Sequence, residues 1–260
     1  MVAMAENIIE IRGLANIFGT QVVHQDLNLD VRRGEILSVI GGSGTGKSVL
    51  LRSIVGLIQP AAGEIRVFGQ DMLSLPAAQR SALVRRFGVL FQKGALYSSL
   101  TVAENVAFPL TELAGLPHGE ALRQARQYLA LAGLPSHAGD KYPPALSGGM
   151  IKRAAMARAL ALSPEILMLD EPTAGLDPVS AAAFDNMIAV LRDALGVTVF
   201  LVTHDLDTLH ALSDRVAVLA DKKVLVADTL EVVSHQDNPW IKDYFAGPRG
   251  RMAATAWKEN

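Results

Sequence analysis

Short apolar runs alternate with helical stretches over most of the chain. Residues 35–40, 166–169, 197–202 and 215–219 are short and mostly apolar, which predicts buried strands. Helical patterns follow three of these runs and begin near residues 48, 178 and 205. This alternation predicts an α/β fold with a mainly parallel sheet.

Two further regions complete the predicted architecture. Residues 7–11, 22–31 and 63–69 have the length and composition of additional strands near the N-terminus. Residues 101–162 are mostly helical in pattern, and apolar side chains in 120–132 recur every three or four positions. We therefore expect a helical lobe inserted into the α/β domain.

We place the main domain at residues 1–245, with the helical lobe at about 97–163, and treat 246–260 as a C-terminal tail. Polar and Gly/Pro-marked residues in the tail favour a mobile segment. The end of the chain is nevertheless rich in aromatic residues, which favours packing against other protein; these are Trp240, Tyr244, Phe245 and Trp257. Both interpretations stay open at this point.

Residues 41–48 match the pattern G-x-x-x-x-G-K-[ST] without a gap. They lie between a predicted strand and a predicted helix, so successive backbone N–H groups and the helix N-terminus can surround a phosphate chain. We expect Lys47 to reach the β- and γ-phosphates and the Ser48 hydroxyl to ligate Mg²⁺. The predicted nucleotide contacts in this loop are Gly41, Gly42, Ser43, Gly44, Thr45, Gly46, Lys47, Ser48 and Val49.

Two carboxylates follow the apolar run at 166–169. In parallel sheets the C-terminal ends of strands are where ligands bind, so Asp170 and Glu171 are candidates for chemistry. Asp170 can hold Mg²⁺, and Glu171, which points elsewhere, can orient and deprotonate an attacking water. A solvated acidic turn is the plain alternative, but the phosphate loop upstream favours the catalytic interpretation.

A second helix start has the character of an anion site. Ser147, with Gly148 and Gly149 after it, opens a helix, and Ser147 is a plausible N-cap. The chain thus has two helix N-termini suited to binding an anion. The simplest explanation is that two copies meet head to tail, so that each copy completes the ATP site of the other. A flexible turn before a helix is the alternative.

Composition narrows the function classes. The chain has 260 residues, 50% of them apolar and 19% charged, with a net charge of −2. Its clusters of Lys and Arg are no larger than pairs, so we expect no nucleic-acid partner. It has no cysteine, which excludes disulfides and thiolate metal sites. The sequence offers neither a membrane span nor a secretory signal, so we expect a cytosolic chain.

Three single residues complete a larger pattern: Gln92 after residues 88–91, Asp177 after 174–176, and His204 after 202–203. Each alone is unremarkable, but their order behind the phosphate loop is specific. The chain resembles the ATP-binding cassette (ABC) ATPases from about residue 8 to 226. The resemblance implies a P-loop NTPase core, an antiparallel β subdomain, an inserted α-helical subdomain, and hydrolysis of ATP with Mg²⁺.

The resemblance also implies roles for the motif residues. Phe18 stacks on adenine, Ser147 to Gly149 contact the γ-phosphate across a homodimer, and Asp177 couples the two sites. The implied Mg²⁺ ligands are Ser48, Gln92 and Asp170, and the implied catalytic residues are Glu171 as base, His204, Gln92 and Lys47.

Two departures from the family pattern are Met150, where glutamine is usual, and Phe18, where tyrosine is common. Neither removes a phosphate contact, so we expect activity to persist.

Residues 90–110 and 146–154 resemble the Mla/Mce-type lipid-transport ATPases. This implies a homodimer that drives an inner-membrane permease for phospholipid, with a STAS-domain cytosolic subunit and a periplasmic lipid-binding MCE-type protein as further partners. An ATPase of an amino-acid or other small-solute importer remains the alternative. Soluble ABC ATPases of DNA repair or translation are disfavoured, because the segment between Ser48 and Leu146 has no sustained heptads and the chain has one cassette.

Overall fold

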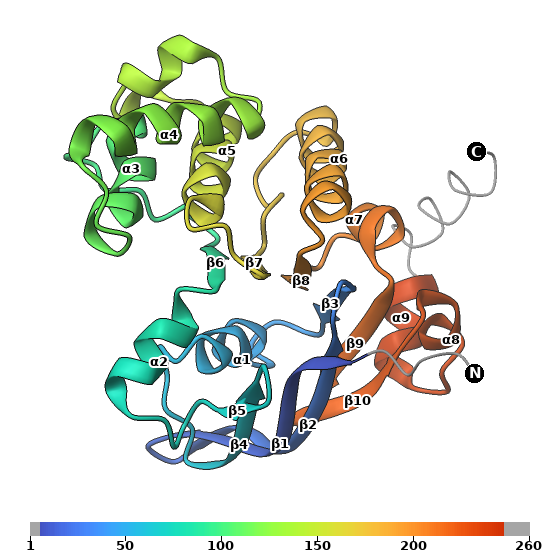
Figure 1. The fold of residues 1–260 in the computed structure, drawn as a ribbon. Helices are drawn as coiled ribbons and strands as arrows, with labels where there is room; N and C mark the ends of the chain where they lie inside the picture. The colour runs from blue at the N-terminus through green and yellow to red at the C-terminus, as the bar shows by residue number, and fades with distance from the viewer. Residues whose placement is uncertain (1–5, 247–260) are drawn as a thin grey trace. The chain divides into compact units, whose positions relative to one another are not determined.

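The computed structural model describes residues 6–246, and within this range the chain forms two compact units. Unit 1 combines the chain up to Pro76 with the chain from Thr198 onward, and unit 2 comprises Ala77–Val197. Figure 1 labels the elements of both units. Within the described range no helix combines the length and the hydropathy needed to cross a bilayer.

Unit 1 contains two sheets and the helices that follow their strands. Its elements are β1 (Asn7–Phe18), β2 (Gln21–Arg32), β3 (Ile36–Ile40), α1 (Lys47–Ile54), β4 (Ala62–Val67), β5 (Gln70–Asp71), β8 (Thr198–Val202), α7 (Leu206–Leu212), β9 (Arg215–Ala220), β10 (Lys223–Asp228), α8 (Leu230–Ser234) and α9 (Pro239–Ala246).

The two sheets of unit 1 differ in strand direction and in burial. The first is antiparallel with the order β2-β1-β4-β5. In the second, β3 pairs in parallel with β8 and with β9, and β10 pairs antiparallel with β9. Every residue of β3 and β8 is buried, as expected for parallel strands covered on both faces. β3 therefore delivers the chain to residue 41 from a rigid position.

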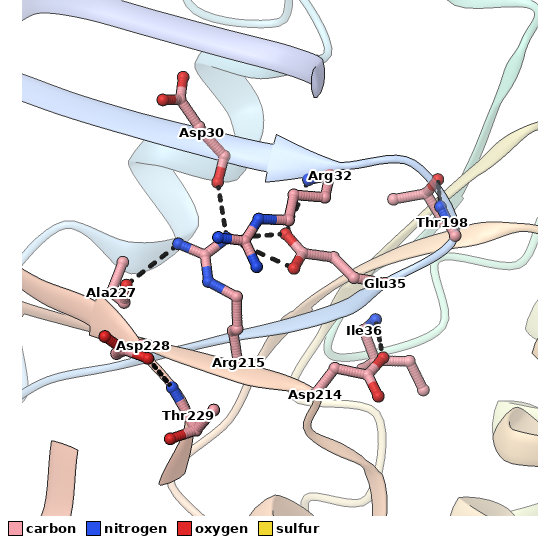
Figure 2. A network of polar contacts seen from close by, with 11 residues as sticks. Asp30, Arg32, Glu35, Ile36, Thr198, Asp214, Arg215, Ala227, Asp228 and Thr229 are labelled. Atoms are coloured by element: carbon pink, nitrogen blue, oxygen red, sulfur yellow. Dashed lines mark hydrogen bonds and ion pairs between the residues drawn. The ribbon is translucent and has the colours of Figure 1, made fainter. Parts of the chain in front are cut away.

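A buried ion pair holds the start of β3. Arg215 on β9 donates to both carboxylate oxygens of Glu35, at 3.1 and 3.3 Å, and also to the backbone oxygen of Ala227 at 3.0 Å (Figure 2). The Glu35 carboxylate accepts from the backbone N–H of Arg32 at 2.7 Å. Burial raises the pKa of Glu35, while this N–H and the Arg215 charge oppose the rise. The network joins β2, β3, β9 and β10 where the strand to the phosphate loop begins.

The C-terminal aromatic residues pack on the core of unit 1. Trp240, Tyr244 and Phe245 on α9 lie against a buried cluster that includes Ile40, Leu209 and Val218, which belong to β3, α7 and β9. Trp240 and Tyr244 are stacked with ring centroids 5.0 Å apart. For these three residues the packing interpretation is therefore confirmed within the chain; Trp257 and residues 247–260 lie outside the described residues.

Unit 2 is mostly helical around two parallel strands. Its elements are α2 (Ala77–Val84), β6 (Phe87–Leu90), α3 (Val102–Glu112), α4 (His118–Leu131), the 3-10 turns η1 (Ser136–Asp140) and η2 (Pro143–Ala145), α5 (Gly148–Leu160), β7 (Ile166–Asp170) and α6 (Pro178–Leu195). β6 pairs with β7 in parallel register.

Small side chains allow the helices of unit 2 to pack closely. One buried cluster joins α3, α4 and α5, which lie together in Figure 1, and much of it is alanine, for example Ala107, Ala125 and Ala154. The close approach continues at Gly88 on β6, where an added Cβ would lie 2.4 Å from the backbone oxygen of Ala159. This packing fixes α5 against the strand that leads to Gln92.

The element predictions from sequence are confirmed with one notable shift. The helix predicted from residue 178 to 195 has those bounds, and the strands near 166 and 215 end one residue later than expected. The first strand was predicted to end at residue 11, but β1 continues to Phe18 through several register shifts. The longer strand arises because cross-strand pairing with β2 tolerates bulges that break the apolar alternation.

Candidate functional site

The phosphate loop begins where β3 ends and leads into α1. Lys47 folds back across the loop, and its Nζ donates to the backbone oxygens of Gly41 and Gly42 at 2.8 and 3.0 Å. Thr45 Oγ1 donates to the same Gly42 oxygen at 2.9 Å. The ammonium group therefore lies within the loop, where a bound phosphate chain would meet it.

Glycine is required in this loop by close backbone approach. A Cβ on Gly41 would lie 2.3 Å from the backbone oxygen of Leu219 on β9, and a Cβ on Gly46 would lie 2.4 Å from His24 Nε2. Gly46 also has a φ of 95°, in the left-handed region, and serves as the N-cap of α1 without any side chain. The first turn of α1 thus faces the loop with backbone N–H groups rather than with a capping side chain.

A buried polar network supports the loop, and the sequence reasoning missed it. His24 on β2 is fully buried, and its Nδ1 lies 2.9 Å from Asn16 Oδ1 on β1. Asn16 Nδ2 in turn donates to Ser53 Oγ on α1 at 3.1 Å. Burial lowers the pKa of His24 to about 4, although backbone groups of Thr45 and Gly46 partly oppose this, so the ring is neutral at pH 7. The available signal was a histidine that follows two valines within a predicted strand.

Phe18 and His204 are the other unit 1 residues in the predicted site. Phe18 ends β1 and is 46% exposed, so its ring is free to stack on a planar ligand. His204 precedes α7, and its backbone oxygen accepts a hydrogen bond from Tyr244 Oη at 3.1 Å. On the same helix as Tyr244, Trp240 Nε1 lies 3.5 Å from the position of a Cβ on Gly42. Helix α9 therefore contacts both the phosphate loop and the His204 segment.

In unit 2, Ser147 is confirmed as the N-cap of α5. Its side chain accepts from the backbone N–H of Met150 at 3.3 Å, and Gly148 and Gly149 form the first turn. Asp177 has the same role for α6, where its carboxylate accepts from Ser180; this hydrogen bonding lowers the pKa of Asp177. Both caps are exposed, so both are accessible to a ligand or to another copy.

Asp170 and Glu171 lie at the end of β7 in contrasting environments. Asp170 is the last residue of the strand and is 3% exposed. Glu171 is partly exposed and has a φ of 50°, unusual for a residue with a side chain. The backbone therefore leaves the extended conformation at Glu171, directly after the buried Asp170. Gln92, exposed after β6, is joined to this segment through Lys152, which the sequence reasoning also missed.

The three residues that the sequence predicts to bind Mg²⁺ all carry oxygen atoms, which suit a hard cation. Ser48 offers a hydroxyl, Asp170 a carboxylate and Gln92 an amide oxygen, and Mg²⁺ prefers oxygen ligands of these kinds together with water. Within residues 6–246 no group of three or more His, Cys, Asp or Glu side chains is arranged to hold a metal by itself.

Three curated relatives match between 80% and 94% of the chain. A probable ribonucleotide transport ATP-binding protein, mkl, of Mycobacterium leprae is 37% identical over 93% of this chain and 69% of that protein. The intermembrane phospholipid transport system ATP-binding protein MlaF of Haemophilus influenzae is 36% identical over 94% of this chain and 92% of its own length. The methionine import ATP-binding protein MetN of Caulobacter vibrioides is 45% identical over 80% of this chain and 62% of its own length.

Solved structures give the same result for the fold. The dimeric post-hydrolysis state of the ATP-binding cassette MJ0796, bound to ADP and Pi, aligns with a TM-score of 0.78 at 30% identity and covers 85% of this chain and 98% of that one. The family profile described as ABC transporter matches residues 24–174, which include the phosphate loop, Ser147 and Glu171. The chain belongs to the ABC transporter family, as an ATP-binding subunit that hydrolyses ATP.

Proposed function

We propose that this ATPase powers a separate inner-membrane permease that moves phospholipid between membranes. The observation that carries the proposal is the match to MlaF, which extends over nearly the full length of both proteins. Similarity over this extent supports a subunit of the same kind of machine. The cargo is inferred from relatedness, because an ATPase subunit need not touch what is transported.

A small-solute importer is the second candidate, and one observation favours it. MetN is more similar in sequence, at 45% identity, although the chain covers only 62% of that protein. The mkl protein carries a third cargo in its name, ribonucleotide, which is also a small solute. The transported substrate therefore has to be identified from the permease that binds this ATPase.

For the chemistry we propose that the nucleotide is held mainly by backbone groups and one ammonium. The N–H groups of residues 41–49 and Lys47 bind the phosphates, Phe18 stacks on adenine, and His204 contacts the γ-phosphate. Glu171 accepts the proton of the attacking water, which Gln92 helps to orient. Catalysis of this type is mostly positioning and charge stabilisation around the transferred phosphoryl group. Mg²⁺, held by Ser48, Asp170 and Gln92, supplies charge neutralisation when bound.

We further propose a head-to-tail homodimer. Ser147 and Gly148 are exposed at the start of α5, with Gly149 next to them in the first turn, and an exposed helix start is suited to an anion bound by a second copy. The dimeric state of the MJ0796 cassette supports this arrangement. Asp177, exposed at the start of α6, would couple the two sites. We place the dimer at the cytoplasmic face of the inner membrane, with a STAS-domain subunit and an MCE-type periplasmic protein as further partners.

The assigned base is tested by Glu171→Gln. We expect hydrolysis to fall by at least about 100-fold while ATP binding persists, because the amide cannot accept the proton. Glu165→Gln is the matched control, since Glu165 is exposed and paired with Arg86. Phosphate release and nucleotide binding are measured on the full-length chain with its membrane partners. Parental turnover in Glu171→Gln would reject the assignment.

The cargo is tested on the complex isolated from gently solubilised membranes. We expect an integral permease and a periplasmic lipid-binding protein to co-purify, and phospholipid vesicles to stimulate hydrolysis. Stimulation by methionine or a ribonucleotide with its binding protein, and none by phospholipid, would favour the small-solute candidate instead.

A further inference from the structure

Lys152 is a charged residue in the interior of unit 2. It lies in the second turn of α5, and only 5% of its surface is exposed. Its buried neighbours on this helix are mostly alanine, such as Ala154 and Ala155. A lysine is rarely buried to this degree unless its ammonium is hydrogen-bonded, because removal of the charge from water is costly. The hydrogen bonds of this ammonium therefore decide why a lysine is buried at this position.

The Lys152 ammonium joins two segments that are far apart in the chain. Nζ donates to the backbone oxygen of Gln92, just after β6, and to the backbone oxygen of Glu171, just after β7, the latter at 2.9 Å. Burial lowers the pKa of Lys152, and the charges of Glu171 and Asp170 oppose that change. A single side chain thus holds the backbone of two residues from the proposed site.

The backbone at Glu171 needs such support. Its φ of 50° lies in the left-handed region, which costs a residue with a Cβ free energy and persists where surrounding contacts hold it. The Glu171 oxygen accepts from Lys152 and, at 3.3 Å, from the N–H of Ala174. The hydrogen bond to the Glu171 oxygen holds the peptide that follows Glu171, so Lys152 restrains the backbone from which the Glu171 side chain starts.

We propose that Lys152 is a positioning residue that holds the Glu171 and Gln92 segments in one arrangement, so that the carboxylate and the amide act on the same water. The inference rests on the proposed roles of Glu171 and Gln92. Lys152 itself touches neither nucleotide nor water in this proposal. Its ammonium also gives a physical route by which displacement of the Gln92 segment reaches Glu171.

The first test is Lys152→Met, which keeps the apolar stem and removes the ammonium. We expect kcat to fall at least about tenfold, with ATP affinity within threefold of the parent, because the phosphate loop is untouched. Removal of the ammonium leaves the backbone oxygens of Gln92 and Glu171 without this donor, so we expect some loss of stability, and kcat is compared on folded protein. Lys152→Arg, which can still donate to two oxygens, should restore most of kcat.

Arg153→Met is the matched control. Arg153 is the next residue on α5, and it donates in the same way to a backbone oxygen, that of Ala132, at 2.9 Å. It also contacts Met187 and no residue of the proposed site. We expect this variant to lose a similar amount of stability and to keep kcat within threefold. An equal loss of kcat in Lys152→Met and Arg153→Met would overturn the positioning role.

A double variant separates positioning from general structural support. If Lys152 acts through Glu171, Lys152→Met should cause no further loss of turnover in a Glu171→Gln background, whereas independent effects add. If Lys152→Met does not fold, Lys152→Gln is measured in its place; its side chain is one bond shorter and cannot reach both oxygens. Parental kcat in the folded variant overturns the proposal.

The same assays keep this inference distinct from the proposed function. If Glu171→Gln retains turnover, the assignment of the base fails whatever Lys152 does. If Glu171→Gln is inactive and Lys152→Met turns over at the parental rate, the positioning role alone fails.

Discussion

The phosphate loop in unit 1 and the Glu171 segment in unit 2 are both supported by buried polar side chains. The supporting side chains are neutral in the first case and carry a positive charge in the second. Behind the loop the support is neutral: His24 bonds Asn16, which bonds Ser53. Behind Glu171 the support is a cation, Lys152, bound to backbone oxygens. A cation is suited to bind carbonyl oxygens that lie beside two carboxylates. The phosphate loop already contains the positive charge of Lys47, which would repel a second cation.

The two regions also differ in what limits their backbone. Steric contact defines the loop, since glycine alone allows β9 and His24 to approach it. Conformational strain defines the other segment, since Glu171 keeps a side chain at a positive φ. The loop has no room for an added atom at its closest contacts. The strained segment instead depends on the hydrogen bonds that hold it. Substitutions in the two regions should therefore fail in different ways.

The largest expected effect comes from Gly41→Ala. The added Cβ would meet the backbone oxygen of Leu219, which is fixed in a buried strand and cannot move aside as a flexible side chain could. We expect ATP binding to fall at least about 100-fold together with a loss of stability of a few kcal/mol. Gly34→Ala is the control, because Gly34 has a φ of 77° and open space around it. Similar losses in both variants would show that backbone conformation, rather than contact, limits the loop.

A comparison of two N-caps gives the next largest effect. Ser147→Ala and Thr101→Ala each remove a cap, of α5 and of α3 respectively, and each should cost about 1 kcal/mol of unfolding free energy. Only Ser147 is assigned a phosphate contact, so turnover should fall by about 100-fold in Ser147→Ala and remain near parental in Thr101→Ala. Chemical denaturation and phosphate release are the measurements. Equal activities would contradict the proposed role of the α5 start.

The smallest expected effect is a pH dependence that belongs to unit 1. His24 has a pKa of about 4 when folded against an ordinary 6.5, so the unfolded chain takes up the proton first as pH falls. The associated stability is present above pH 6.5 and is lost as pH falls from 6.5 to 4, by at most about 3 kcal/mol. His24→Leu should flatten this part of the profile in denaturation measured across pH. An unchanged slope would show that His24 is not the titrating group.

Much of the architecture follows from patterns that span only a few residues. The helix at 178–195, with a capping aspartate, a proline in its first turn and a glycine at its end, carries its own boundaries. The buried strands before residues 41 and 170 are continuous apolar runs. β1 was predicted too short, since its later residues pair with β2 through irregular register that no local alternation reveals.

The phosphate loop, the carboxylates after β7 and the cap at Ser147 could be found from sequence because each is a set of consecutive residues whose chemistry depends on local backbone geometry. The residues that support these motifs could not be found from the sequence. Lys152 acts on Gln92, 60 positions away, and Asn16 acts on Ser53, 37 positions away. Such pairs are brought together by helix packing and strand pairing, and nothing in the spacing of the residues marks them. The amino-acid order is enough to predict which residues meet the nucleotide, and folding specifies which buried groups support those segments.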